Sequence, residues 1–129
     1  MAGEEPSFPY DNGFFDRIQV NHPTPSVSAL AAFQTGRGAQ IIAQCRGEAF
    51  PTETSIGWLF DASGGRGVAP SVWPPYPGRL VGYAGGICPD NVTQVIADIG
   101  ATAPYWLDME SGVRTDDRFD LGLCERVCQ

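Results

Sequence analysis

The chain contains no lysine and only one histidine, His22, so several kinds of catalytic chemistry lack the residues they need. Without lysine there is no Schiff-base nucleophile and no P-loop lysine. A single histidine leaves little material for a Ser-His-Asp triad or a histidine metal site. The eight basic residues are all arginines, against 15 acidic residues, which gives a formal net charge of −7. This acidity disfavours nucleic acid as a partner, because phosphate neutralisation needs a basic face.

Long apolar runs are absent as well. No stretch approaches the roughly 18 apolar residues of a membrane span, and the N-terminus lacks the basic and apolar regions of a signal peptide. We therefore expect a cytoplasmic protein with no membrane partner. The 129 residues are 43% hydrophobic, enough for one core. They fall short of the about 250 residues of a complete eight-stranded α/β barrel. We expect a flexible N-terminal arm over residues 1–13 and a single domain over residues 14–129.

The four cysteines are even in number, but without an export signal we expect free thiols rather than disulfides. Cys124 and Cys128 lie four residues apart, on one face of a predicted terminal helix. That spacing allows a metal pair or two small apolar residues that pack inward, and we favour inward packing. The sequence gives no other indication of a metal site, and we expect no cofactor.

Sixteen glycines and 11 prolines separate short apolar runs that are typical of buried strands. Several of these runs lack strict alternation of apolar and polar residues, which favours parallel strands covered on both faces. The predicted strands are Asp16–Val20, Gln40–Gln44, Ile56–Phe60, Leu80–Ala84 and Tyr105–Met109.

Helical patterns alternate with these strands. Thr24 as N-cap and Pro25 at the first helical position predict a helix through Phe33, which Gly36 and Gly38 would end. Strands that alternate with helices predict an α/β fold with right-handed crossovers, whose ligands bind in loops after the carboxyl ends of the strands. Two further helices are predicted, over Pro89–Ile99 and from Leu121 to Cys128.

The loop after the third predicted strand carries a candidate catalytic carboxylate. Asp61 ends a strongly apolar strand, and burial there would favour its neutral form, which suits general acid or base chemistry. An aspartate that caps the loop is an equally good interpretation. Gly65 and Arg66 follow in the same glycine-rich loop and could support a site.

The two later loops indicate an anion site. Gly85 and Gly86 would let the backbone approach a ligand closely, and a helix that begins at Pro89 would point its free N–H groups at the same place. Ser111 and Gly112 follow the last strand and could donate further hydrogen bonds to that anion. For the Gly85-Gly86 loop alone, an ordinary tight turn is the alternative.

Together, these segments resemble the phosphoribosylanthranilate isomerases of tryptophan biosynthesis, in the order found in that family. The family has Leu-Leu-Asp before a Gly-Gly-Thr-Gly loop and a Trp, then Leu-Ala-Gly-Gly-Leu-x-Pro-Glu-Asn-Val, then Asp-Val-Ser-Ser-Gly-Val-Glu. An upstream Gln-Leu-His-Gly strand matches only weakly. The similar residues here are Leu59–Asp61 with Gly64–Gly67 and Trp73, then Tyr83–Val92, then Asp108–Arg114, and upstream Gln19–His22.

The resemblance implies a partial (βα)8 TIM-barrel-like fold of about five parallel strands, corresponding to strands four to eight of the family. It implies that Asp61 is the general acid, which protonates the sugar ring oxygen during an Amadori rearrangement. It also implies that Gly85, Gly86, Ser111 and Gly112 hold the substrate phosphate.

This sequence departs from the family in two ways. The family's catalytic base is a cysteine on the first strand, and its anthranilate-binding arginine follows the second strand; neither strand is present here. Glu110 and Arg114 stand where the family has Ser and Glu. A carboxylate at position 110 would repel phosphate unless it turns away or pairs with Arg114.

Three functional hypotheses follow. The chain is an isomerase-like enzyme, either a piece of a longer product or one half of an assembled barrel. Alternatively, it is a non-catalytic module that binds phosphate or a phosphosugar without the catalytic base. In the third, it transforms another phosphorylated or carboxylated small molecule with Asp61 and Asp108 as the working carboxylates. Five parallel strands leave two open edges, so we expect a homo-oligomer or a complementary chain to cover them.

Overall fold

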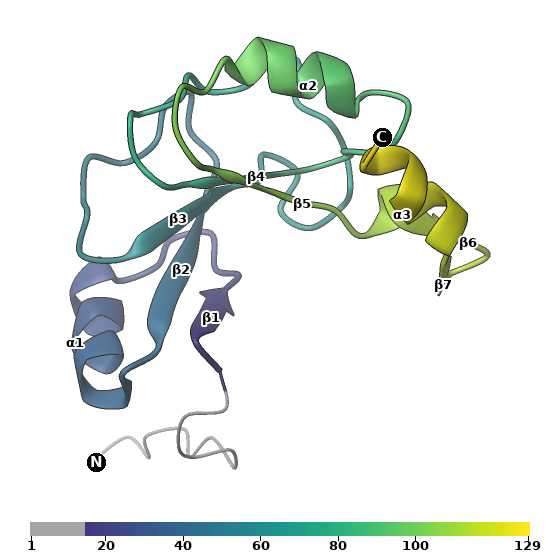
Figure 1. The fold of residues 1–129 in the computed structure, drawn as a ribbon. Coiled ribbons are helices and arrows are strands. Elements are labelled where there is room, and N and C mark those ends of the chain that lie inside the picture. The colour runs from purple at the N-terminus through teal and green to yellow at the C-terminus, as the bar shows by residue number, and fades with distance from the viewer. Residues whose placement is uncertain (1–14) are drawn as a thin grey trace.

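The computed structural model of the protein describes residues 15–129, and the predicted arm over residues 1–13 lies outside this part (Figure 1). Within it, five strands form one sheet in the order in which they occur along the chain, and every neighbouring pair is parallel. The sheet curls into a half-barrel, which confirms the predicted partial α/β barrel. The strands are β1 (Arg17–Val20), β2 (Gln40–Cys45), β3 (Gly57–Phe60), β4 (Gly82–Ala84) and β5 (Trp106–Asp108).

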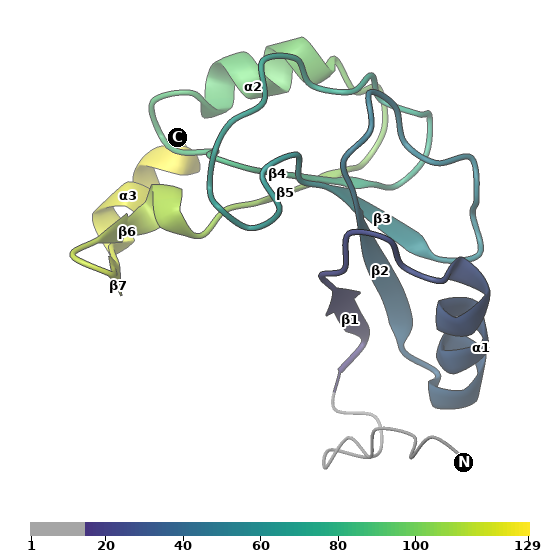
Figure 2. The ribbon, with the colours of Figure 1, turned by 180° about the vertical axis from the view of Figure 1, so that it is seen from behind.

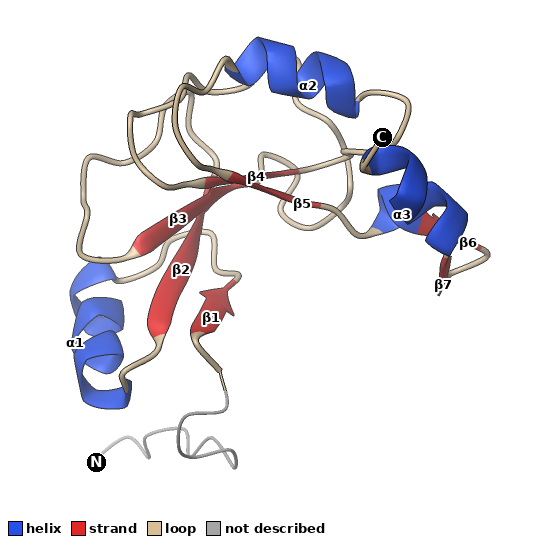
Figure 3. Ribbon diagram, in the orientation of Figure 1, coloured by secondary structure: helices blue, strands red, loops and turns tan. Residues whose placement is uncertain are grey.

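Short helices accompany the sheet (Figure 3). None of the helices within residues 15–129 has the length and the apolar surface that crossing a bilayer requires. A short 3₁₀ helix and a small antiparallel hairpin follow β5, and the sequence did not predict either. The elements are α1 (Val27–Arg37), α2 (Val92–Ile99), the 3₁₀ helix η1 (Ser111–Val113), β6 (Arg114–Thr115), β7 (Arg118–Phe119) and α3 (Leu121–Val127).

The predicted bounds of α1 were wrong at both ends. Ser26, rather than Thr24, is the N-cap, and its carbonyl accepts the first helical hydrogen bond. The helix continues past Phe33 because Gly36 keeps a helical backbone, and a glycine inside a helix costs only about 1 kcal/mol. Gly38 ends it in the left-handed conformation (φ 72°), with its N–H donated to a carbonyl of the last turn.

The C-terminal helix begins at its predicted residue because Asp120 caps it. One carboxylate oxygen of Asp120 accepts hydrogen bonds from the amides of Gly122 and Leu123, at 2.9 and 3.2 Å. The expected inward packing of its cysteines was wrong: Cys124 is half-buried and Cys128 is exposed, because α3 packs mainly on η1 and buries no residue fully. All four cysteines are free thiols.

The main hydrophobic core lies on the outer, convex face of the sheet, against which both α1 and α2 pack (Figure 2). Tyr83 of β4 lies at its centre, with no exposed surface. Its ring makes edge-to-face contacts with Phe50, Trp73 and Tyr105, at centroid distances of 5.2, 6.2 and 6.1 Å. Aromatic residues in the long loops before and after β3 therefore fill space that helices would cover in a more regular α/β unit.

The inner, concave face of the sheet has a much smaller apolar cluster, formed by Ile42, Leu59 and Ala84. Trp106 of β5 packs against it, and its indole lies over Gly82, where a Cβ atom would overlap the ring. From the opposite edge strand, the guanidinium of Arg17 lies 5.8 Å from the Trp106 ring centroid. Side chains of the two edge strands thus meet and cover the inner face near the amino ends of these strands.

Candidate functional site

A cavity of about 250 Å³ lies where the parallel strands end, above the apolar cluster of the inner face. We call it the strand-end pocket. Every strand of the sheet contributes a residue or the loop that follows it, as expected for ligand sites of parallel α/β folds. Its lining includes Gln19, Asn21, Gln44, Asp61, Gly65, Arg66, Gly67, Gly85, Asp108, Glu110, Ser111, Arg114 and Asp117.

Most of the predicted site residues therefore meet in one place. The predicted residues that line the pocket are Asp61, Gly65, Arg66, Gly85, Asp108 and Ser111. The strand register explains this convergence: Ala84 and Asp108 are paired residues of β4 and β5, so their side chains share the inner face. Gly86 and Gly112 lie outside the lining.

The carboxylate of Asp61 is buried and organises the loop that follows it. Its Oδ1 accepts hydrogen bonds from the amide and the hydroxyl of Ser63, at 3.0 and 2.7 Å. Its Oδ2 accepts from the amide of Gly65 at 2.6 Å and from the side-chain amide of Gln44 at 3.1 Å. These four contacts give Asp61 the loop-capping role that the sequence allowed, and its role as a general acid stays a prediction.

Gln44 is a site residue that sequence reasoning missed. It is buried near the end of β2, and its Oε1 accepts a hydrogen bond from Arg46 Nη2 at 3.0 Å. That contact orients the side-chain amide so that Nε2 faces Asp61. A polar residue directly after the apolar run Ile41–Ala43, on the same side of the strand as Ile42, was the available signal.

Asp108 contrasts with Asp61, although both line the pocket at the carboxyl end of a strand. No hydrogen bond to the Asp108 carboxyl group occurs within residues 15–129. Partial burial raises its pKa, and the negative charges of Asp61 and Glu110 raise it further. Asp108 is therefore the carboxyl group of this pocket that is available to a ligand.

Arg114 neutralises the acidic side of the pocket. Its Nη2 lies 3.2 Å from the carboxylate of Glu110, and its Nη1 donates a hydrogen bond of 3.0 Å to Asp117. Its guanidinium also lies 5.4 Å from the ring centroid of Phe119. Of the two alternatives for Glu110, it adopts the pairing with Arg114.

The loop with Gly85 and Gly86 and the loop with Ser111 and Gly112 approach each other, but Gly86 and Gly112 contact protein backbone. Gly86, at φ 63°, leaves no room for a side chain, because a Cβ atom would lie 2.5 Å from the amide nitrogen of Ala69. A Cβ at Gly112 would overlap the carbonyl oxygen of Ile87. Gly85, at φ 111°, lies beside Asp61 and lines the pocket. These glycines are required at least for the packing of the loops.

The expectation that α2 begins at Pro89 was wrong. The helix begins at Val92, and the preceding residues form a turn that the side chain of Asn91 holds. Asn91 Oδ1 accepts a hydrogen bond from the Cys88 amide at 2.8 Å, and its Nδ2 donates to the Gly86 carbonyl at 2.9 Å. The Cys88 amide, just before the expected helix start, therefore already has a partner.

No cysteine takes the place of the family's catalytic base. Among the described residues, the lining of the pocket contains no cysteine. Cys45, at the end of β2, packs against the outer-face core, and burial raises the pKa of its thiol to about 11. The thiol is therefore protonated at neutral pH. Across residues 15–129, no group of three or more His, Cys, Asp or Glu side chains is arranged to hold a metal ion.

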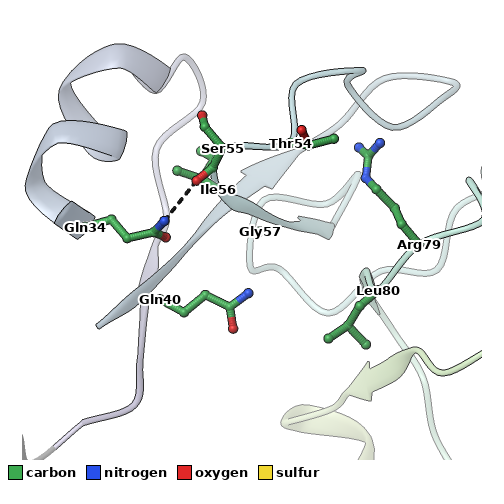
Figure 4. A pocket seen from close by; sticks show the side chains of 8 residues that line it. All are labelled: Gln34, Gln40, Thr54, Ser55, Ile56, Gly57, Arg79 and Leu80. Atoms are coloured by element: carbon green, nitrogen blue, oxygen red, sulfur yellow. Dashed lines mark hydrogen bonds between the residues drawn. The ribbon is translucent and has the colours of Figure 1, made fainter. Parts of the chain in front are cut away.

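A second cavity, of about 190 Å³, lies at the opposite end of the strands (Figure 4). Gln34 closes one side of it by tying α1 to the sheet: its side-chain amide donates to the Ser55 carbonyl at 2.9 Å and accepts from the Ile41 amide at 2.7 Å. Arg79 donates to the carbonyl of Pro51. These side chains are engaged in holding the fold, as is usual at the amino ends of parallel strands.

Comparison of the chain with protein-family models, with curated proteins and with solved structures found no match.

Proposed function

We propose that the strand-end pocket binds a phosphorylated sugar, and that this chain corresponds to the C-terminal part of a phosphoribosylanthranilate isomerase-like barrel. One observation carries the proposal. The three loops on which the resemblance rests are far apart in the sequence, yet residues of all three line a single cavity at the carboxyl ends of parallel strands. Loops at the carboxyl ends of parallel strands are where ligands of such folds bind, so this convergence supports a binding site built from the three segments.

If the chain is an isomerase, its ligand is a phosphoribosyl amine that undergoes Amadori rearrangement from aldose to ketose. Asp61 would protonate the ring oxygen as the bond between that oxygen and the anomeric carbon breaks, while the amine nitrogen forms a double bond to that carbon. A base would then remove the proton from C2, next to the anomeric carbon, and the resulting enol would tautomerise to the ketose. Asp108 is the carboxyl group positioned to exchange a proton with a ligand in addition to Asp61, since its own oxygens accept no hydrogen bond from residues 15–129.

A second candidate, a phosphosugar-binding module without turnover, is favoured by the cysteines. The family's base is a cysteine, whereas the half-buried Cys45 packs away from the pocket as a protonated thiol. Binding would then persist without the rearrangement. The third hypothesis, another reaction that uses both Asp61 and Asp108, has the same pocket and differs only in the ligand.

The test combines binding with turnover. Ribose 5-phosphate is titrated against the chain by calorimetry, with ribose as the control, and phosphoribosylanthranilate is supplied while its fluorescence is followed. Binding with loss of fluorescence supports the isomerase. Binding of ribose 5-phosphate alone supports the module. If ribose 5-phosphate binds no more tightly than ribose, and fluorescence does not change, both candidate functions are wrong.

The assembly of this chain belongs to the same proposal. In the described sheet, β1 pairs only with β2 and β5 only with β4, so each edge strand has one side without a strand partner. We propose that a second copy or a complementary chain covers these edges in the cytoplasm. Light scattering of the purified chain at micromolar concentration tests this. A single species with the mass of one chain would contradict it.

A further inference from the structure

The charged side chains of the strand-end pocket differ in whether they have partners. Six charged residues line it, and four of them are carboxylates. Arg114 is shared between Glu110 and Asp117, so its charge is already compensated. Arg66 forms no ion pair within residues 15–129. Among the described residues that line the pocket, it is the one cation whose charge remains available.

The stem of Arg66 is held in place while the end of its guanidinium stays open. Its backbone N–H donates to the Ser63 hydroxyl at 3.1 Å, and its Nε donates to the Ser63 carbonyl at 2.8 Å. Ser63 is itself fixed by Asp61, whose Oδ1 accepts from both its amide and its hydroxyl. The two Nη groups of Arg66 have no hydrogen-bond partner in the described part of the chain. Two parallel N–H donors of this kind suit bidentate binding of a phosphate.

The main chain offers less to an anion than the sequence predicted. Gly86 packs on Ala69, and Gly112 packs on Ile87, so both glycines face protein rather than the cavity. The amide of Cys88 is occupied by Asn91. Gly86, Gly112 and Cys88 therefore give an anion little support, and among the side chains that line the pocket the available cation is Arg66.

We propose that Arg66 is the residue that binds the phosphate of the pocket's sugar ligand, and that Asp61 positions it through Ser63. This inference rests on the proposed function and names the group that gives the pocket its preference for a phosphate ester over the free sugar. The family has threonine at the corresponding place in its Gly-Gly-Thr-Gly loop, so the role belongs to this chain's own residue.

The experiment measures dissociation constants for ribose 5-phosphate and ribose with four proteins: wild type, Arg66→Gln, Arg66→Lys and Arg118→Gln. Arg118 is exposed on β7, outside the pocket, so its variant matches the loss of one positive charge. Circular dichroism confirms that each variant is folded. We expect Arg66→Gln to weaken ribose 5-phosphate binding by about tenfold or more, corresponding to about 1.4 kcal/mol, and to leave ribose binding unchanged.

Arg66→Lys should fall between wild type and Arg66→Gln, since lysine keeps the charge but loses the bidentate geometry. Arg118→Gln should bind like wild type. If wild type binds ribose 5-phosphate and Arg66→Gln binds it within about twofold, the role of Arg66 is wrong and the proposed function stands. If Arg118→Gln weakens binding as much as Arg66→Gln, the effect is one of net charge, and the assignment is again wrong. If wild type does not bind, both proposals fail together.

Discussion

The two faces of the sheet are built in opposite ways. Among the described residues, the outer-face cluster contains 13 buried hydrophobic residues, and the inner-face cluster contains three. The outer face is covered by α1, by α2 and by aromatic side chains from long loops, whereas Trp106 and Arg17 cover the inner face near the amino ends of the edge strands. The inner face at the carboxyl ends of the strands is left for polar groups. Stability therefore depends mainly on the outer face, which leaves the inner face available for a site.

On the inner face, the strands also change from apolar to polar along their length. On this face, Ile42 is followed by Gln44, Leu59 by Asp61, and Trp106 by Asp108. The apolar residues lie in the middle of the sheet, and the polar ones begin at its carboxyl end. A partial barrel can thus keep a small closed core below a polar pocket.

The largest effect should come from the outer face. Phe60 is 3% exposed and contacts both Phe50 and Trp73. Phe60→Ala removes a ring from a closely packed cluster, so we expect the free energy of unfolding to fall by about 3–5 kcal/mol. Val72→Ala, at a side chain that is 76% exposed, should change it by less than about 0.5 kcal/mol. Urea denaturation measures both, and similar losses in the two variants would show that Phe60 does not belong to a closely packed core.

Asp61 should give the next largest effect. Asp61→Asn places a donor where Asp61 now accepts four hydrogen bonds, so at least one donor, such as the Gly65 amide, loses its charged partner. We expect a loss of about 1.5–3 kcal/mol in unfolding free energy at pH 7. Amide hydrogen exchange should also show faster exchange at Ser63 and Gly65. Unchanged stability and exchange would mean that Asp61 does not organise the loop.

Gly82→Ala tests the inner face directly. The added methyl group overlaps the indole of Trp106, so the ring must move away from Ile42 and Leu59, and we expect a loss of about 1–3 kcal/mol. Gly36 provides the matched control, because it lies within α1 with open space around it. Gly36→Ala should stabilise the chain by about 0.5–1 kcal/mol. Thermal denaturation of both variants is sufficient, and a stabilised Gly82→Ala would show that the ring does not cover this face.

The smallest effect should come from Asp108, and its sign is opposite to that of Asp61. Because its pKa is raised in the folded protein, the ionised form at pH 7 opposes folding. Asp108→Asn should raise Tm at pH 7, and the gain in unfolding free energy should stay within about 0.5 kcal/mol because solvent screens this site. The gain should shrink as the pH falls and vanish near pH 3, where the carboxyl group is protonated in both states. A gain that does not depend on pH would contradict this account.

Sequence reasoning was most successful where a single segment determines the outcome. Each predicted strand has a counterpart in the sheet, because an apolar run between glycines and prolines needs no distant partner to be recognised. The start of α2 was misplaced because the side chain of Asn91, rather than Pro89, sets the turn before it. The hairpin of β6 and β7 was missed because its strands are two residues long and its turn uses Asp116 and Asp117 at positive φ.

The candidate site was predictable in its location but not in its contacts. The position of Asp61 follows from the end of an apolar strand, whereas its contact with Gln44 depends on how β2 and β3 are aligned. The glycines of the two later loops were expected to face a ligand. Their packing on Ala69 and Ile87 could not be foreseen, since it depends on contacts between loops distant in the sequence.

The most direct test of the central claim is an NMR titration of the isotope-labelled chain with ribose 5-phosphate, read at the backbone amides. We predict saturable shifts at Gly65, Arg66, Gly85 and Ser111, which line the strand-end pocket. Free ribose at the same concentrations should produce smaller shifts. The contradicting result would be no saturable shift at these amides, or shifts confined to the cavity at the amino ends of the strands, around Gln34 and Arg79.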